Sequence, residues 1–599
     1  AIDAVSDSQK RLTQLVSNII LVVDDPSLTE KRKLEIIRNQ AISMLDSHDD
    51  AFVKKADFLD KYREKEKKDL IFINALIEQS RSLSLAIGKT LQLLVFDEST
   101  DNPKLFEAIR NYQNKQGKIT KHAPIKFLVK KEKDVIFQND KFNVPLYKMF
   151  LYRHIVSQIK SGELSLQYSY EYRSLDGYLI SPDDWSRNKT RLIKDAGLTK
   201  YTSAKQHLNR LKGMLESTYD RVNNHYAKGE NYWLKIRPNG RFYVKTPAID
   251  YDQSKFISTL LAYDGEIPIM QVLRETNRVS QFTNHFTHHA NRNSVNEITP
   301  EIAIAGIMGL GCNIGTRRMA NKSVGIKNGA LVDAVNWRFS TDNLRKINKS
   351  IVTEIESLKL PNIYKIDDNC LLSSSDGKKI TVAVDSLLAN YSYKYYGRDK
   401  GVSIYSFINE KQTLFHSTVF SSSDREAIYL VDGLLHNSTS INHIHTTDTH
   451  GYTEAIFAVT HLIDISFAPR FKRIEDQVTY TFHSKDYYKD KDYRILPSRR
   501  INRKLIEDNW DDILRFIATV KLGRTSASQL FKRLNTYSKD NPLYKALKEF
   551  GRIQKSLHIL NYFDDLEFRQ KIQKQLNKVE LSNKFSDAVF WDRGKQFHV

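Results

Sequence analysis

Leu371-Leu-Ser-Ser-Ser-Asp-Gly-Lys378 has the pattern of a β-strand that carries an acidic side chain to its open end. The apolar start favours a buried strand, and Asp376 stands directly before Gly377, a residue typical of turns. Downstream, Ile441-Asn-His-Ile-His-Thr-Thr-Asp448 ends in the same way. The segment between the two aspartates is long enough for two more strands and a helix.

A third acid, Glu580, lies inside a long helical pattern. Ile572, Leu576, Leu581 and Phe585 recur there at helical intervals. Two strand-end aspartates and a helix glutamate supply the hard oxygen ligands that hold a divalent metal against a phosphodiester. The three acids therefore predict a metal-dependent phosphodiester enzyme.

The order of elements around the two aspartates supports this interpretation. After the first strand the sequence predicts strands at 401–407 and 414–420, a helix at 424–435, the Asp448 strand, an apolar helix at 452–463 and a fifth strand at Val478–Phe482. Strand, strand, strand, helix, strand, helix is the ribonuclease H-like layout. In that layout strands one and four are neighbours, so we expect Asp376 and Asp448 to lie side by side.

The fold class predicted for the whole chain is mixed. A mainly α-helical N-terminal half is followed by an α/β ribonuclease H-like domain with a helical insertion. The predicted divisions are 1–175, helical and a candidate dimerisation region; 176–298, an α+β linker or DNA-contact region; 299–365, a helical scaffold; 366–483, the core with the first two acids; 484–560, a basic loop and helical insertion; and 561–599, the helix of the third acid.

Charge favours a polyanionic partner. Lys and Arg number 92 against 71 Asp and Glu, a net charge of +21, which suggests nucleic acid before membrane; the alternative is a charge that serves solubility. Cys312 and Cys370 are the only cysteines, which excludes a disulfide scaffold and favours a reducing compartment. No apolar run approaches the length of a membrane span.

Several basic residues are candidates for contact with DNA. A hairpin is predicted at 232–245, where apolar and basic residues alternate around Pro238-Asn-Gly240. Its Lys235, Arg237 and Lys245 either touch phosphate or solvate an exposed sheet face. The other candidates are Arg317 and Arg318 beside Gly315, Arg470, and Arg499 and Arg500 in a stretch rich in Tyr, Lys and Arg.

A rival site occupies the same strand. His443, His445, Asp448 and His450 are similar to the ligand signature of binuclear zinc hydrolases, since imidazole suits zinc. The spacing departs from that signature on both sides of the aspartate, and histidines on strands more often pack or form hydrogen bonds. This alternative predicts tightly bound zinc, whereas the carboxylate set predicts weakly held Mg²⁺ or Mn²⁺.

From about residue 300 to 590 the chain resembles the TnpA transposases of replicative bacterial transposons, the Tn-three family. The matching blocks are Asn313-Ile-Gly-Thr-Arg-Arg-Met-Ala320, Ser373-Ser-Ser-Asp-Gly377, Glu426-Ala-Ile-Tyr-Leu-Val-Asp-Gly-Leu-Leu435, Thr447-Asp-Thr-His-Gly-Tyr-Thr-Glu454, Phe467-Ala-Pro-Arg470, Trp510-Asp-Asp-Ile-Leu514, Phe550-Gly-Arg-Ile553 and Leu576-Asn-Lys-Val-Glu-Leu-Ser-Asn583. Before residue 300 the resemblance is looser.

The resemblance implies a DDE transposase with Asp376, Asp448 and Glu580 as its triad and two Mg²⁺ ions per site, for which Mn²⁺ substitutes. Water activated at the metals would nick the 3′ transposon ends, and each freed 3′-OH would attack target DNA, giving a cointegrate. It also implies a homodimer acting on double-stranded DNA, at terminal inverted repeats and target, in the bacterial cytoplasm at the nucleoid. Lys378 and Val579 depart from the family, which often has Gln and Gly there.

The resemblance further implies that end-reading modules precede Ala1 and that helices follow Val599. A non-enzymatic alternative is a DNA-binding or assembly protein on a catalytically inactive ribonuclease H-like fold. The presence of all three acids argues against it.

Overall fold

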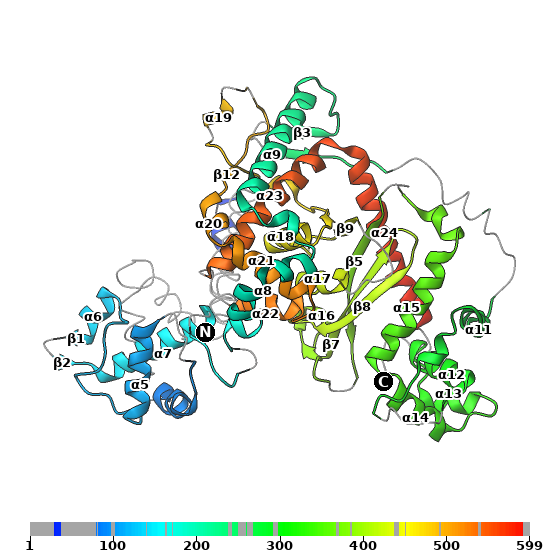
Figure 1. The fold of residues 1–599 in the computed structure, drawn as a ribbon, viewed down its shortest axis with the longest axis horizontal. Coiled ribbons are helices and arrows are strands. Elements are labelled where there is room, and N and C mark those ends of the chain that lie inside the picture. The colour runs from blue at the N-terminus through cyan, green and yellow to red at the C-terminus, as the bar shows by residue number, and fades with distance from the viewer. Residues whose placement is uncertain are drawn as a thin grey trace. The chain divides into compact units, whose positions relative to one another are not determined.

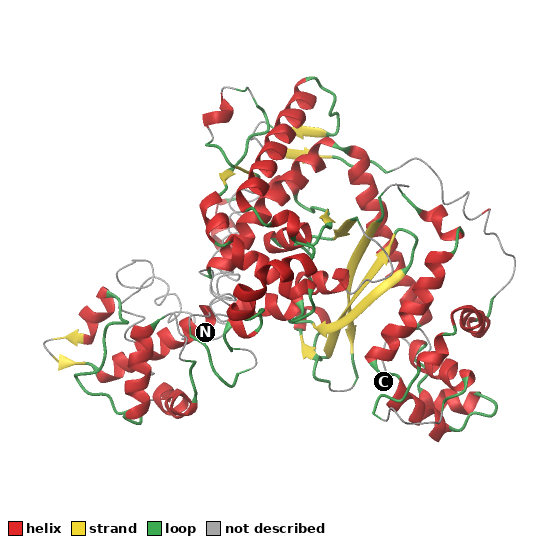
Figure 2. Cartoon of the chain, in the orientation of Figure 1, coloured by secondary structure: helices red, strands yellow, loops and turns green. Residues whose placement is uncertain are grey.

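The computed structural model divides the chain into two compact units, residues 1–168 and 169–599, each described here by itself. It describes residues 29–36, 80–97 and 102–590, apart from 31, 81, 139–140, 162–163, 170–171, 238–241, 249–258, 260–266, 291–296, 367–369, 384–385, 436–442, 450, 485, 490, 492 and 537–540. Figures 1 and 2 show the elements in order and by type.

The N-terminal unit is mainly helical over its described residues, as predicted. Residues 82–93 form a helix, followed by α5 (Pro103–Asn114), α6 (Lys130–Ile136), the short hairpin of β1 (Phe137–Gln138) and β2 (Lys141–Phe142), and α7 (Val144–Ser161). Pro103 starts α5 because its missing N–H needs no partner there, and the Asn102 side chain accepts a hydrogen bond from Leu105 N. The hydroxyls of Tyr112 and Tyr152 join α5 to α7 at 2.7 Å.

The larger unit is built on a mixed sheet. Its strands are β5 (Leu372–Thr381), β6 (Asn390–Tyr391), β7 (Lys400–Asn409), β8 (Leu414–Ser421), β9 (Ile444–Thr447) and β10 (Ser466–Phe467). The order is β10-β9-β5-β7-β6, with β8 also paired to β7. β5 is parallel to β9 and antiparallel to β7, so the predicted neighbourhood of the first and fourth strands is confirmed.

A strand forms within the predicted segment Val478–Phe482, but it does not join the main sheet as its fifth strand. There β11 (Tyr480–Thr481) pairs with β12 (Arg499–Arg500) and forms a separate two-stranded sheet. The strand beside β9 is β10 instead, in a segment where a proline argues against a strand.

Pro469 is tolerated next to β10 because the backbone nitrogen of residue 469 points away from β9. The N–H groups of Ser466, Ala468 and Arg470 donate to the carbonyls of β9 at 2.8–2.9 Å. Pro469 falls between two donating positions, so its missing N–H breaks no bond to β9.

Helices cover both faces of this sheet (Figure 1). α17 (Ala427–Leu435) and α18 (Glu454–Leu462) pack on one face with aromatic residues of β7, and α24 (Leu566–Val589) packs on β5 from the other. α18 in turn crosses α23 (Pro542–Asp564) very closely. A Cβ atom on Gly551 would lie 1.7 Å from the carbonyl oxygen of Glu454, so this crossing requires glycine.

The remaining helices belong to the larger unit. They are α8 (Pro182–Asp195), α9 (Ala204–Ala227), α11 (Ile269–Ser280), α12 (Pro300–Gly311), α13 (Thr316–Lys322), α14 (Asn328–Arg338), α15 (Thr341–Ser357), α16 (Tyr393–Tyr396), α19 (Asp486–Lys489), α20 (Arg503–Asp508), α21 (Trp510–Lys521) and α22 (Ala527–Thr536). The hairpin predicted at 232–245 is present as β3 (Leu234–Ile236) and β4 (Phe242–Val244), its turn lying outside the described residues. Among the described helices none is long and apolar enough to cross a membrane.

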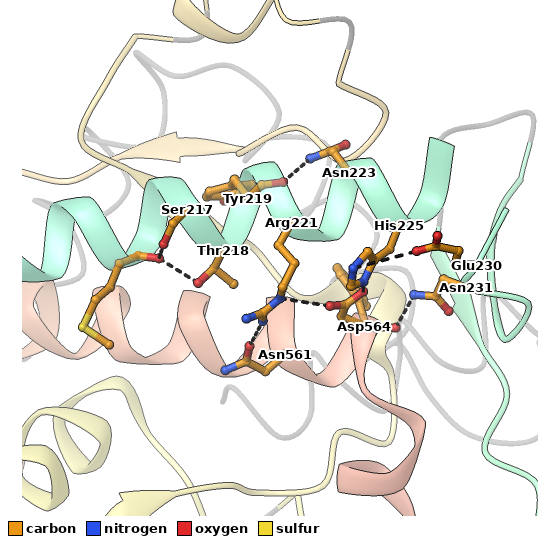
Figure 3. Close-up of polar contacts among 12 residues, drawn as sticks. Ser217, Thr218, Tyr219, Arg221, Asn223, His225, Glu230, Asn231, Asn561 and Asp564 are labelled. Carbon is orange, nitrogen blue, oxygen red and sulfur yellow. Dashed lines mark hydrogen bonds and ion pairs between the residues drawn. The ribbon is translucent and has the colours of Figure 1, made fainter. Parts of the chain in front are cut away.

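A polar joint ties α9 to the end of α23 (Figure 3). The buried carboxylate of Asp564 accepts hydrogen bonds from Arg221 Nε at 3.1 Å and His225 Nδ1 at 2.8 Å. Arg221 also donates to Asn561 Oδ1 at 2.6 Å, and Asn231 donates to the carbonyl of Phe563 at 2.8 Å. The joint fixes the corner from which α24 begins.

Candidate active site

The register of two strands places Asp376 beside Asp448. β5 and β9 pair in parallel from Leu372↔Ile444 to Ser375↔Thr447, so the next residue on each strand is an aspartate. Residues paired in a parallel sheet point to the same face, and both carboxylates therefore leave the sheet on the side that carries α24. The predicted juxtaposition of the two aspartates is confirmed.

The sequence predicts Asp376 at the end of its strand, but the residue lies in the middle of β5. β5 continues to Thr381 because Gly377–Thr381 stays paired with β7 after β9 has ended. The glycine interpreted as a turn is thus a strand residue. Beyond Ser375 the β9 side of β5 is open, and Asp376 lies at the start of this open edge.

The carboxyl of Asp376 is half-buried and is influenced by other negatively charged side chains. Burial, the negative charge of Asp448 and that of Glu426, in this order, raise its pKa to about 6. Hydrogen bonds from the Gly377 backbone and from Asn583 act in the opposite direction. The causes of this shift are burial, two acids and two hydrogen-bond donors, and no Lys or Arg of the described part of the chain is among them.

Helix α24 reaches Asp376 through Asn583. Its Nδ2 donates to Asp376 Oδ2 at 2.9 Å, and Lys378 pairs with Asp587 one turn further along at 2.5 Å. Glu580 lies on the same helix, three residues before Asn583, and its side chain is exposed. The predicted helix is present, but the contact with Asp376 comes from an amide and not from the third acid.

The apolar pattern of α24 holds over only part of the helix. Ile572 and Leu576 are buried, whereas Leu581 and Phe585 are exposed by 61% and 71%. The packed face of the helix consists instead of Gln575, Val579 and Asn583. The side-chain amide of Gln575 donates to the Ser374 hydroxyl, and the backbone carbonyl of Gln575 accepts a hydrogen bond from this hydroxyl at 3.0 Å.

A buried histidine lies beneath the two aspartates, on the other face of the sheet. His445 of β9 contacts the hydroxyls of Ser373 and Ser375 of β5, each at 2.8 Å, through its two ring nitrogens. Ser375 in turn donates to the hydroxyl of Tyr405 at 2.8 Å. Burial lowers the pKa of His445 to about 3, so the ring is neutral and holds the two strands in register.

This arrangement rules out the zinc alternative for His445. Both of its nitrogens are used inside the protein, and the ring is fully buried. His443 Nδ1 accepts a hydrogen bond from Leu371 N at 3.1 Å, and His450 lies outside the described residues. His443 and His445 therefore hold β9 against β5 through hydrogen bonds, the more ordinary role for histidine in a sheet.

Comparison with known proteins agrees with this geometry. The model of the Tn3 transposase DDE domain matches residues 271–599, which is more than half of the chain. The chain belongs to the Tn3 transposase family. This is the family, Tn-three, that the motifs around Asp376, Asp448 and Glu580 resemble.

Named Tn3-family relatives match over most of this chain. The transposase of transposon Tn1546 from Enterococcus faecium is 30% identical over 539 residues, covering 88% of this chain and 53% of the relative. That of Tn2501 from Escherichia coli is 28% identical, covering 81% and 48%. That of transposon gamma-delta from Escherichia coli K12 is 22% identical, covering 75% and 45%. The chain spans about half the length of the curated relatives it matches.

The eight basic candidates for DNA contact lie in four separate segments of this Tn3-family chain, and Lys245 of the hairpin segment is exposed. Lys235 and Arg237 are exposed on the outer face of the β3–β4 hairpin, where Arg237 lies 5.6 Å from the ring of Tyr243. Arg317 and Arg318 are exposed on α13. Arg470, half-buried, donates through its N–H to the carbonyl of Thr447 and through Nη1 to Gln573 of α24, so it joins the Asp448 strand to the α24 helix.

The last two candidates, Arg499 and Arg500, form the exposed strand β12. Arg500 also lines an open pocket of 720 Å³ with Lys212, His483, Arg503 and Lys504. Glu507 also lines the pocket and pairs with Arg503, so the surface is mainly but not wholly basic, and a mainly basic concave surface can accommodate phosphate.

The donor set of the aspartates fits a divalent metal in part. Asp376 and Asp448 provide two adjacent carboxylates whose mutual repulsion a cation relieves, and carboxylate oxygen is the ligand that Mg²⁺ and Mn²⁺ prefer. Over the described residues, however, no group of three or more His, Cys, Asp or Glu side chains is close enough to hold a metal ion.

Three contacts at this site were not predicted from the sequence. Asn583 contacts Asp376, His445 braces the strands below it, and Glu426 acts on Asp376 from α17. Asn583 and Glu426 belong to the sequence blocks that resemble the family. The blocks indicated that these residues matter, but they did not indicate what the residues contact. For His445 the sequence held no local signal, because its partners Ser373 and Ser375 both lie on β5, far away along the chain.

Proposed function

We propose that this chain carries the catalytic centre of a DDE transposase, which nicks the 3′ ends of transposon DNA and joins them to target DNA in replicative transposition. The observation that carries the proposal is the β5–β9 register, which sets Asp376 beside Asp448 in a chain of the Tn3 transposase family. The two half-buried carboxylates repel each other, and a bound divalent cation would relieve this repulsion.

The fold we infer for the catalytic region is ribonuclease H-like. Strand order supports it: β8, β7 and β5 are antiparallel neighbours, and β9 and β10 continue the sheet in parallel on the other side of β5. When these five strands are numbered along the chain, their order across the sheet is 3-2-1-4-5. The two aspartates belong to strands 1 and 4. The α17 helix connects β8 to β9, and the α18 helix connects β9 to β10.

Catalysis in this proposal rests on positioning. When bound, divalent metal ions at the carboxylates would polarise the scissile phosphate and lower the pKa of the attacking water or 3′-hydroxyl. Asp376 and Asp448 supply the ligands and are held in register by the His445 hydrogen bonds below them. Asn583 donates a hydrogen bond to Oδ2 of Asp376 and so helps to fix the orientation of this carboxylate.

Glu580 is proposed as the third acid. The α24 helix that carries it is docked on the Asp376 strand, and it lies about one turn from Asn583, which already contacts Asp376. Two Mg²⁺ ions per site, held by the three acids, are the proposed cofactor, with Mn²⁺ able to replace them. A homodimer acting on terminal inverted repeats and target DNA is the proposed assembly.

The test is nicking of DNA that carries the ends of the chain's own transposon, with Mg²⁺ or Mn²⁺ present. We expect strand cleavage by the unaltered chain and losses of at least about a thousandfold in Asp376→Asn, Asp448→Asn and Glu580→Gln, because each substitution removes a ligand of the reaction centre. Asp342→Asn is the matched control, since Asp342 is an exposed partner of Arg345 on α15. Metal-dependent nicking that survives in Asp376→Asn would refute the proposal.

A further inference from the structure

A short basic segment forms the corner between β12 and α20. Arg499 and Arg500 make up β12, and Arg503 and Lys504 begin α20, so four cations fall within six residues. Like charges this close to one another repel, and an anion bound between them would relieve the repulsion. The corner is therefore a place where the chain concentrates positive charge.

Hydrogen bonds anchor this corner to two other elements. The N–H of Ile501 donates to the carbonyl of Thr481 in β11 at 2.7 Å, and the N–H of Asn502 donates to the carboxylate of Glu549 in α23 at 3.2 Å. The Asn502 side chain also caps α20, where it accepts a hydrogen bond from Leu505 N at 3.1 Å. The cations are thus carried by a fixed backbone.

The cations of the corner line one side of a pocket. Arg500, Arg503 and Lys504 surround the open pocket of 720 Å³ together with Lys212 of α9. The elements that carry them, α9, β12 and α20, lie close together in Figure 1. Among the described lining residues four are Lys or Arg and one, Glu507, is acidic, so the pocket has an excess of positive charge.

Two of the four cations are available to a ligand. Arg500 donates through Nε to the carbonyl of Phe482 at 3.2 Å, and over the described residues its two terminal nitrogens have no further partner. Lys504 is exposed, and within the described part of the chain no carboxylate lies within ion-pair distance of its ammonium group. These two side chains carry the charge that the protein itself does not compensate.

The other two cations are oriented by their neighbours. Arg503 donates through Nε to Glu507 Oε1 at 2.8 Å and through Nη1 to Asn209 Oδ1 of α9 at 2.7 Å. Lys212 lies 3.8 Å from Glu216 Oε1 on its own helix. These contacts hold α20 against α9 and keep the two sides of the pocket in place.

We propose that this pocket is a contact site for the phosphate backbone of duplex DNA, with Arg500 and Lys504 as its main phosphate ligands. The inference rests on the proposed function, since it names the part of the surface that holds the DNA substrate. A guanidinium with free terminal nitrogens binds two phosphate oxygens at once, and an ammonium adds a point charge. A pocket of 720 Å³ is larger than one phosphate group, so it admits a length of backbone. Contacts of this kind bind DNA without reading its sequence.

The test measures the binding of a random-sequence duplex to the chain by fluorescence anisotropy at several salt concentrations. We expect the double variant Arg500→Gln/Lys504→Gln to bind at least about tenfold more weakly at about 100 mM salt. The slope of log K against log salt should become shallower by about 1.8, since each lost phosphate contact removes about 0.9. Lys346→Gln/Lys349→Gln is the matched control, because it removes two exposed cations of α15 outside the pocket and should leave the slope nearly unchanged.

Glu507→Gln tests the pocket in the opposite direction, since a gain in binding cannot arise from a loss of folding. The substitution removes the acid of the lining and releases Nε of Arg503, so we expect duplex DNA to bind about fivefold more tightly. Asp342→Asn is the matched control, because it likewise releases an arginine, Arg345, outside the pocket, and it should not tighten binding.

Three outcomes would overturn the inference and leave the proposed function standing. The first is an unchanged salt slope in Arg500→Gln/Lys504→Gln, and the second is an equal loss of binding in this variant and in the α15 control. The third is tight binding of ATP that depends on Arg500 while duplex binding does not, which would make the pocket a nucleotide site. The proposed function itself fails if metal-dependent nicking survives in Asp376→Asn, whatever the pocket variants do. Circular dichroism melting of each variant confirms that it is folded.

Discussion

At the scale of single residues, the site is organised around the charge of Asp376. Its carboxyl has a raised pKa because burial and two neighbouring acids oppose ionisation, and only Asn583 and the Gly377 backbone favour it. An ionised carboxylate under these conditions destabilises the metal-free protein, and a bound cation would remove this destabilisation. The same property makes Asp376 testable without any assay of activity.

Replacing Asp376 with Asn should stabilise the metal-free protein by more at pH 8 than at pH 5. Because the folded-state pKa is about 6 and the usual value is 3.8, the folded state binds more protons between these values, and stability falls as the pH rises through this window. We expect a gain of about 1–2 kcal/mol at pH 8, discounted for partial exposure. Urea unfolding at both pH values measures it. A loss of stability at pH 8 would show that Asp376 is paired with a cation.

His445→Ala should destabilise the protein and disturb the site together. The substitution leaves the hydroxyls of Ser373 and Ser375 without their partner and opens a cavity between β5 and β9, at a cost of about 3 kcal/mol. Nicking should fall with it, because Asp376 and Asp448 directly follow these strand segments. Metal analysis of the purified chain is the second readout: zinc present in the unaltered protein and absent in His445→Ala would revive the zinc interpretation.

At the scale of elements, the sequence predicted which helices and strands exist better than how they meet. The strands at β5, β7, β8 and β9 and the long α24 helix were predictable, because apolar alternation and helical periodicity are local signals. β10 was not, because hydrogen bonds to β9 at alternate residues outweigh the proline, and that pairing is a tertiary effect. Gly377 was interpreted as a turn for the same reason: its need to admit Glu426 is visible only once α17 is placed.

Asn583→Ala tests how α24 serves Asp376. The alanine removes the hydrogen bond of 2.9 Å and leaves the helix otherwise intact, so we expect a stability loss of about 1 kcal/mol and a reduction in nicking of about tenfold. Asp587→Asn is the matched comparison, since it removes only the pairing with Lys378 on an exposed part of the same helix. Nicking reduced equally by both variants would mean that docking of α24, and not the orientation of Asp376, is what matters.

At the scale of the whole molecule, charge and length are the informative quantities. The chain carries +21 and spans about half of relatives that are named transposases. Its basic candidates lie on separate elements, and none of them forms a motif that reads base edges. The sequence predicted these cations from composition, but not that Arg470 joins β9 to α24 while Arg500 lines a basic pocket.

We therefore expect this chain to bind duplex DNA strongly and with little sequence preference. Contacts with phosphate give affinity through counterion release, and neutralising roughly six phosphates gives a slope of log K against log salt of about −5. Binding should weaken about a thousandfold between 50 and 200 mM salt. Competition between transposon-end and random duplexes measures both properties, and a preference above about a hundredfold for the end sequence would show that the chain reads bases.

The central claim, that Asp376, Asp448 and Glu580 serve one metal centre, is tested most directly by a structure of the chain bound to transposon-end DNA and Mn²⁺. We predict an anomalous Mn²⁺ peak between Asp376 and Asp448 with the Glu580 carboxylate within reach of the same centre, since metal–oxygen bonds are about 2–2.6 Å and paired metals about 4 Å apart. Any two of these carboxylates more than about 10 Å apart in that complex would contradict the claim.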